Sequence, residues 1–118
     1  MDFQIKKRSV AGSVDAILAD ESVRAVYSAF GDGMMSCFGM DIRNIRSIHC
    51  AKTLRQVQSF SKEYGDDAVD IVNRIYGKHH GMCQNRPVGA NLFSQGKRWF
   101  VNDVLAEVYL ERKLEADW

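Results

Sequence analysis

Apolar residues at helical spacing near the C-terminus constrain the fold of this 118-residue chain more than any other feature. Over residues 97–114, one apolar residue follows another after three or four positions, which gathers them on one face of an α-helix. This face holds Val101, Val104, Leu105, Val108 and Tyr109, and Leu110 and Leu114 widen it. The pattern predicts a long C-terminal helix with a broad buried face.

The middle of the chain repeats this period in two shorter segments. Residues 51–64 form the first segment, and Gly65 follows it as a residue that readily adopts the left-handed conformation of a helix end. Residues 66–76 form the second segment, with Asp66 as the expected N-terminal cap. Together the two segments predict a helical hairpin over residues 51–76.

The N-terminal third leaves helix and strand open, because short apolar runs fit both. Two short helices would span residues 13–18 and 22–30, with Ser13 and Ser22 as their caps. Gly31 would then end the second of these helices.

A strand is the alternative for part of this region, since residues 24–30 suit one and residues 3–6 alternate as an edge strand does. Three glycines in residues 31–39 predict a loop, and residues 77–98 form the longest irregular connection. No linker or repeat divides the chain, so we expect one domain over residues 1–118. The predicted fold class is mainly α, and the alternative is α+β with a small N-terminal β element.

The chain carries no recognisable export or membrane signal. Its N-terminal basic residues are not followed by the apolar run of about 7–15 residues that a signal peptide needs. No segment reaches the ~18 uninterrupted apolar residues of a spanning helix. Cys37, Cys50 and Cys83 are odd in number and widely spaced, unlike a disulfide framework. We therefore expect a cytoplasmic protein with free thiols and no cofactor.

Charge is segregated along the chain, although the formal net charge is only +1. Residues 42–62 and residues 71–102 are two basic windows that contain no acidic residue. Their basic residues are Arg43, Arg46, Lys52, Arg55 and Lys62 in the first window, and Arg74, Lys78, Arg86, Lys97 and Arg98 in the second. The small net charge excludes indiscriminate binding by a basic tail, but it allows one directed basic face.

Three uses of these windows stay open. The second window also contains the aromatic residues Tyr76, Phe93, Trp99 and Phe100. Positive charge beside exposed aromatic rings is how proteins hold single-stranded nucleic acid, and the helix that begins at Lys97, Arg98 and Trp99 is the best placed to do so. The same residues would also suit an acidic protein surface, or simply solvate the faces of helices.

Residues 79–83 hold the densest cluster of coordinating side chains, and the spacing of His80 and Cys83 suits two zinc ligands in one tight turn. Cys37, His49 and Cys50 would have to complete a tetrahedral site. Structural zinc sites usually show two close pairs of ligands, and this chain shows one. The alternative is that the cysteines are small buried groups and the loop histidines are solvated.

Cys37 is the candidate nucleophile of an enzyme. It follows a glycine-rich segment, and a loop that leads into a helix can lower the pKa of a thiol. A nucleophilic cysteine also needs a base within hydrogen-bond reach, which any of the three histidines could supply. Most chains of this length hold such a set of residues somewhere, so an enzyme is the less favoured class.

The stretch from Val26-Tyr27 to Ser36-Cys37-Phe38 resembles a Val-Tyr, Gly, Ser-Cys run of small bacteriophage proteins whose role is unknown. The resemblance implies a phage or mobile-element accessory protein, and it assigns no chemistry to any residue.

The sequence therefore favours a binding protein. The leading hypothesis is a small non-enzymatic protein that modulates or inhibits a host protein or nucleoprotein complex by stoichiometric docking. The alternative is nucleic-acid binding through the two windows, with Arg43, Arg46, Lys52, Arg55, Lys78, Arg86, Lys97, Arg98 and Trp99 as the contacts. A second alternative is a Cys-dependent enzyme that uses Cys37, or a small zinc-binding domain that uses His80 and Cys83.

Overall fold

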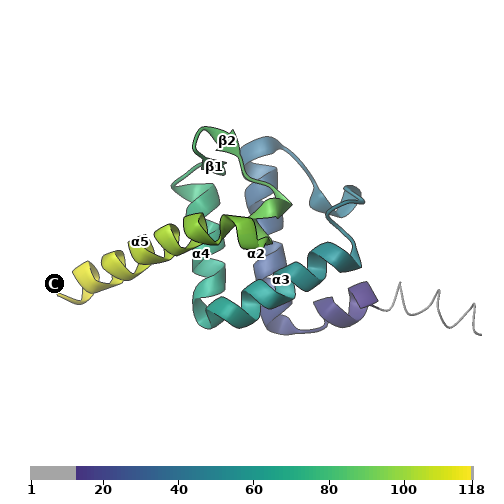
Figure 1. Ribbon diagram of the computed structural model, residues 1–118, viewed down its shortest axis with the longest axis horizontal. Coiled ribbons are helices and arrows are strands. Elements are labelled where there is room, and N and C mark those ends of the chain that lie inside the picture. Colours follow the sequence, from purple (N-terminus) through teal and green to yellow (C-terminus); the bar gives the residue numbers. More distant parts are fainter. Residues whose placement is uncertain (1–12, 118) are drawn as a thin grey trace, which may run out of the picture.

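The structure, a computed structural model, describes residues 13–117 and is mainly α-helical, which confirms the predicted class (Figure 1). A short helix over residues 13–18 precedes α2 (Glu21–Phe38), α3 (Ala51–Tyr64), α4 (Ala68–Gly77) and α5 (Arg98–Ala116). The connections contain the 3-10 helices η1 (Ile42–Asn44), η2 (Gly65–Asp67), η3 (Ala90–Phe93) and η4 (Gln95–Lys97). The edge strand expected at residues 3–6 lies outside the described residues.

Helices α2 and α4 lie side by side at the centre of the molecule, and the other elements pack around them (Figure 1). Helix α3 contacts one end of α2, while α5 crosses α4. The two predicted helices of the hairpin are present, and α3 has the predicted bounds. They meet at the tight turn η2, after which α4 packs chiefly along α2.

Helix α2 is longer than the sequence suggested, because it continues through the glycine-rich segment that was expected to be a loop. The prediction that Gly31 ends this helix is wrong. Its N-terminal cap is Asp20, whose carboxylate accepts a hydrogen bond from the Ser22 backbone N–H at 2.9 Å. The helix ends at Gly39, which adopts a left-handed conformation with φ 66°. The strand alternative for residues 24–30 is wrong as well.

The buried Gly33 shows why this helix carries glycine. A Cβ atom at this position would lie 2.6 Å from the Cβ and Cδ2 atoms of Tyr76 on α4, which is closer than two such atoms can approach. Without a side chain at Gly33, α2 and α4 come together directly. Glycine is therefore selected here by packing between helices, which overrides its weak helix propensity.

The described residues contain one small β-sheet, and it lies in the connection between α4 and α5 (Figure 1). Strands β1 (Met82–Cys83) and β2 (Arg86–Pro87) pair in antiparallel fashion. The two residues between them, Gln84 and Asn85, have φ 51° and φ 63°, as a tight type I′ hairpin turn requires. The sheet is thus found in the segment that was expected to be irregular.

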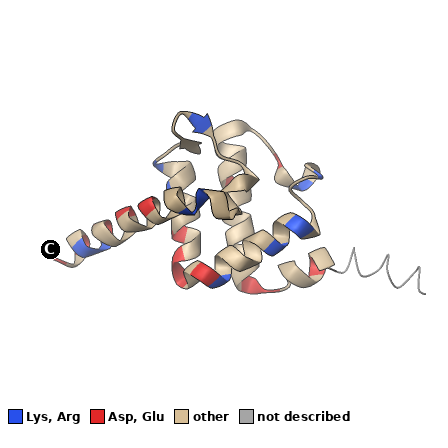
Figure 2. Cartoon of the chain, viewed as in Figure 1, with Lys and Arg blue, Asp and Glu red and all other residues tan. Residues whose placement is uncertain are grey.

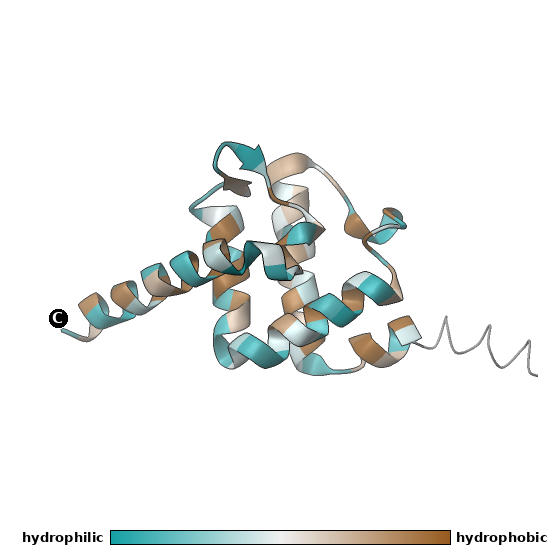
Figure 3. Cartoon of the chain, viewed as in Figure 1, coloured by the Kyte–Doolittle hydropathy of each residue, from teal (hydrophilic) through white to brown (hydrophobic). Residues whose placement is uncertain are grey.

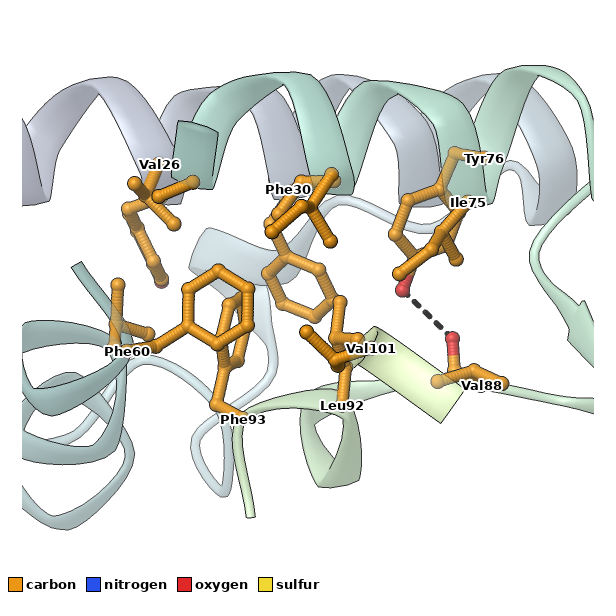
Figure 4. Close-up of a cluster of buried hydrophobic side chains, with 14 of the residues drawn as sticks. Val26, Phe30, Phe60, Ile75, Tyr76, Val88, Leu92, Phe93 and Val101 are labelled. Carbon is orange, nitrogen blue, oxygen red and sulfur yellow. Dashed lines mark hydrogen bonds between the residues drawn. The ribbon is translucent and has the colours of Figure 1, made fainter. Parts of the chain in front are cut away.

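Aromatic rings from three elements form the centre of the hydrophobic core (Figure 4). Phe93 of η3 lies between Phe30 of α2 and Phe60 of α3, with ring centroids 5.0 Å and 5.2 Å away in edge-to-face contact. Near them, the buried Tyr76 hydroxyl donates a hydrogen bond of 2.7 Å to the Val88 carbonyl. The connection between α4 and α5 is therefore a structural part of the core.

Helix α5 has two parts with different surroundings. Up to Val108, its inner face is buried against the body of the protein. Beyond Val108 the helix projects from the body, and the apolar positions Tyr109, Leu110 and Leu114 are more than half exposed (Figures 1 and 3). The prediction of a broad buried face is therefore right for the first part of α5 and wrong for the second.

One polar cluster anchors the projecting part of α5 to the start of α4. The Asp67 carboxylate accepts hydrogen bonds from the Tyr109 hydroxyl at 2.8 Å and from the Arg112 guanidinium at 2.7 Å. Arg112 also pairs with Asp70 at 2.5 Å. These hydrogen bonds hold the pKa of Asp67 below its usual range. Asp67 and Asp70 thus bind α5, whereas the predicted cap Asp66 lies in η2, and α4 begins without a side-chain hydrogen bond at its cap.

Candidate functional site

The fold removes two of the ten basic residues of the windows from the surface. Arg74 forms ion pairs with Glu107, at 4.0 Å, and with Glu111, and its side chain is only 13% exposed. Arg98 pairs with Glu63 at 3.1 Å and is 11% exposed. The windows are free of acid along the sequence, but the folded structure brings acid to them.

Arg98 is mainly a structural residue. Its guanidinium lies over the rings of Phe60 and Tyr64, 5.4 Å and 5.7 Å from their centroids, and Nη1 donates to the carbonyls of Phe93 and Ser94. Its Nη2 atom is buried without an acceptor among the described residues. Arg98 therefore ties the start of α5 to α3 and η3 and is a poor candidate for a direct contact with a ligand.

Two grooves flank the η3–η4 segment, and neither is lined by an acidic residue. The first, which we call the hairpin groove, has a volume of about 510 Å³. Its lining residues are Cys83, Gln84, Arg86, Pro87, Val88, Asn91 and Lys97. Arg86 and Lys97 carry its charge, and neither forms an ion pair with a described residue.

The second groove, which we call the α3 groove, has a volume of about 230 Å³. Its lining residues are Arg55, Gln56, Ser59, Phe93, Ser94, Gln95 and Arg98. Arg55 is exposed and has no carboxylate partner within residues 13–117, in contrast to Arg98. Lys52 lies one helical turn before Arg55 and is also exposed.

The predicted contact residues thus separate into different places. Arg55, Arg86 and Lys97 lie around the η3–η4 segment. Arg43 and Lys78 line two other cavities, and each of these cavities is also lined by carboxylates. Basic segments at β2, at the start of α5 and on the first half of α3 contrast with acidic segments around η2 and the start of α4 (Figure 2). The exposed Arg46 lies in the turns after η1 and lines none of these cavities.

The expectation of exposed aromatic rings beside these charges is wrong for three of the four residues. Tyr76, Phe93 and Phe100 are buried, because each packs into the core. Trp99 is 46% exposed, but it lines neither groove. The basic residues of the grooves therefore lack a ring on which a base could stack.

The cysteine and histidine residues do not assemble into a site in the part of the chain that the structure describes. No group of three or more His, Cys, Asp or Glu side chains there could hold a metal ion. Cys83 is buried in the core, while His80 is exposed in the turn before β1. His79, expected in solvent, contacts Glu107 of α5 at 2.8 Å.

Cys37 lies in the last turns of α2 and donates its thiol hydrogen to the Tyr76 carbonyl at 3.1 Å. This contact directs the thiol toward the backbone of α4. The hydrogen bond of His49 is made to a different side chain: its Nδ1 atom lies 2.9 Å from the Tyr27 hydroxyl. Burial raises the pKa of Tyr27 to about 12, so this hydroxyl stays protonated at neutral pH.

The cavity beside the Tyr27–His49 pair was not foreseen from the sequence. It has a volume of about 680 Å³, and its walls combine apolar residues with charges of both signs. Arg24, Asp32 and Arg43 are among these charges. Arg24 and Asp32 come from α2 and Arg43 from η1, and no local motif announces that these two elements enclose a cavity.

Cys50 is the thiol that the sequence undervalued. It is the N-terminal cap of α3, and hydrogen bonding from the Thr53 side chain and backbone lowers its pKa. We expect iodoacetamide to label Cys50 several-fold faster than Cys37 or the buried Cys83 at neutral pH, because the thiolate is the reacting form. Peptide mass spectrometry over a labelling time course measures this. The variant Thr53→Val should slow the labelling of Cys50, and faster labelling of Cys37 would contradict the expected order.

No protein family, curated protein or solved structure matches this chain. No helix within residues 13–117 has the length and apolar character needed to cross a lipid bilayer. The geometry of the grooves therefore carries the choice of partner class, and the phage or mobile-element class stays a prediction.

Proposed function

We propose that the protein is a small, non-enzymatic, cytoplasmic binding protein that docks on nucleic acid through the hairpin groove and the α3 groove. The observation that carries this proposal is the placement of Arg55, Arg86 and Lys97. They come from α3, β2 and η4, yet they lie around one short segment whose two flanking grooves contain no lining carboxylate. A polyanion that crosses the η3–η4 segment would meet positive charge on both sides.

The polar lining of the grooves favours nucleic acid over an acidic protein. The cores of protein interfaces are enriched in aromatic residues and Met and depleted of Lys. The grooves instead present the amides of Gln56, Gln84, Asn91 and Gln95 beside their basic residues. Amide and hydroxyl groups hydrogen-bond to phosphate and sugar oxygens, which make up most polar contacts to a nucleic-acid backbone.

The burial of the aromatic residues decides the mode of binding within this proposal. Stacking on single-stranded bases requires exposed rings at the site, and the grooves offer only the buried Phe93. The contacts are therefore directed at phosphates, and sequence preference is weak because phosphate contacts carry little sequence information.

A matched pair of variants tests the proposal. Arg86→Gln/Lys97→Gln removes the two basic residues of the hairpin groove, while Lys62→Gln/Lys78→Gln removes two exposed lysines outside both grooves. Fluorescence anisotropy with a labelled duplex of about 20 base pairs should show affinity that falls steeply with salt. The groove variant should bind roughly tenfold more weakly, with a log–log salt slope shallower by about 2, because each lost phosphate contact lowers the slope by about 0.9.

The control variant should retain the affinity and the slope of the unchanged protein. Absent binding, salt-insensitive binding or equal losses in both variants would overturn the proposal. Salt-sensitive capture of an acidic protein with no binding to the duplex would support the leading hypothesis of the sequence, a protein partner, in its place.

A further inference from the structure

The outward face of α5 carries a second apolar stripe that no part of the described structure covers. Successive residues of a helix are turned by about 100°, so residues along α5 can be assigned to faces directly. Phe100, Val101, Val104 and Val108 face the core. On the opposite side, six exposed residues fall within an arc of about 100°. They are Trp99, Asp103, Ala106, Leu110, Lys113 and Leu114.

The exposure of this stripe is unusual for a helix that is already packed on one side. Trp99, Leu110 and Leu114 are 46%, 59% and 55% exposed. A helix on the surface of a monomer normally turns a polar face to water, and apolar residues on two opposite faces indicate a helix enclosed from both sides. The body of the protein encloses the inner side only (Figures 1 and 3).

The order of residues along the stripe identifies a second copy of the chain as the occupant. When two copies of α5 lie antiparallel about a two-fold axis midway between Ala106 and Leu110, Ala106 of each copy opposes Leu110 of the other. In the same register Asp103 opposes Lys113, and symmetry repeats the pair. A small side chain then faces a large one at Ala106–Leu110, and a negative charge faces a positive one at Asp103–Lys113.

Asp103 and Lys113 are free to form this contact. Neither forms an ion pair with another described residue, whereas Glu107, Glu111 and Arg112 of the same helix all do. We infer that the protein forms a two-fold symmetric homodimer through the outward face of α5, with antiparallel helices and reciprocal Asp103–Lys113 pairs. One helix pair forms a small interface, so the dimer is weak and depends on concentration.

Other occupants fit this stripe less well. The stripe carries one acidic and one basic residue, Asp103 and Lys113, and so offers nucleic acid no net attraction. A membrane surface attracts helices whose polar flanks are rich in Lys and Arg, and here acid dominates the flanks. The inference is independent of the proposed function, because the grooves and the stripe share no residue.

A charge exchange tests both the dimer and its register, and all of the substituted residues are exposed. Sedimentation velocity of the full chain should show a species approaching twice the 13.4 kDa of one chain as concentration rises. Asp103→Lys and Lys113→Asp should each weaken association roughly tenfold, because each turns two attractive pairs into repulsive ones. The double variant Asp103→Lys/Lys113→Asp should restore the association of the unchanged protein.

The control is Glu115→Lys, which makes the same change in charge on the same helix but off the stripe; it should leave the association unchanged. A monomer at every concentration would overturn the inference. Failure of the double variant to restore association would overturn the register. Unchanged association of Asp103→Lys alone would overturn it as well, because in a parallel pair position 103 faces its own copy and the exchange replaces one like-charged pair with another.

Discussion

Replacing Phe93 with alanine is expected to lower the free energy of unfolding by about 3–5 kcal/mol, the usual cost of removing a fully buried phenylalanine. Phe93 is 2% exposed, and its ring contacts the edges or faces of the rings of Phe30 and Phe60. Phe30 belongs to α2 and Phe60 to α3. Without the Phe93 ring, the connection between α4 and α5 loses its contact with both of these helices in the core. Urea denaturation followed by circular dichroism measures the loss.

Two further variants separate the loss of the Phe93 ring from general unfolding. A domain of this size is stabilised by only about 5–15 kcal/mol, so Phe93→Ala could be largely unfolded. Phe93→Leu retains most of the apolar volume and should fold with a loss of about 1–2 kcal/mol. Trp99→Ala removes a larger but half-exposed ring six residues later and should cost less than Phe93→Ala. Equal losses at Phe93 and Trp99 would contradict the described core.

Replacing Gly33 with alanine is expected to cost about 3 kcal/mol, despite the better helix propensity of alanine. The added methyl group would meet the ring of Tyr76 in the contact between α2 and α4. Tyr76 cannot turn aside easily, because its hydroxyl is held by the buried hydrogen bond to the Val88 carbonyl. Thermal unfolding should show a clearly lower midpoint for this variant.

Gly31 provides a matched control in the same helix. A Cβ atom there would lie 3.3 Å from the Ile42 Cδ1 atom, which is tight but adjustable because the neighbour is the end of a flexible side chain. Gly31→Ala should therefore be neutral or stabilising by up to about 1 kcal/mol, which is the gain in helix propensity. A destabilised Gly31→Ala together with a tolerated Gly33→Ala would contradict the described packing of α2 on α4.

The elements predicted correctly from the sequence are the helices in which apolar residues recur every three or four positions without a break. Helix α3 has the expected bounds, and α5 begins within one residue of its expected start. The second half of helix α2 was missed because local rules read three glycines in nine residues as a loop. The reason for Gly33 lies in Tyr76, which is far away in the sequence, and no local pattern contains that contact.

The candidate site was only partly predictable for the same reason. Acid-free windows identified Arg55, Arg86 and Lys97, but they also included Arg74 and Arg98, whose glutamate partners lie more than 30 residues away. The windows alone do not show which basic residues form ion pairs with glutamates in the folded protein. They also could not show that Phe93 of η3 and Phe100 of α5 are buried, because they contact rings that lie far away in the sequence.

The division of α5 at Val108 has a consequence for how this chain can change over generations. Before Val108, a substitution on the inner face disturbs the packing that the whole domain needs. Beyond the Asp67–Arg112 contact, the helix is held by little more than its own backbone hydrogen bonds, so substitutions there leave the rest of the domain intact. The last turns of α5 can therefore drift or adapt to a new partner without risk to folding, and a reporter or affinity tag fused there should be equally well tolerated.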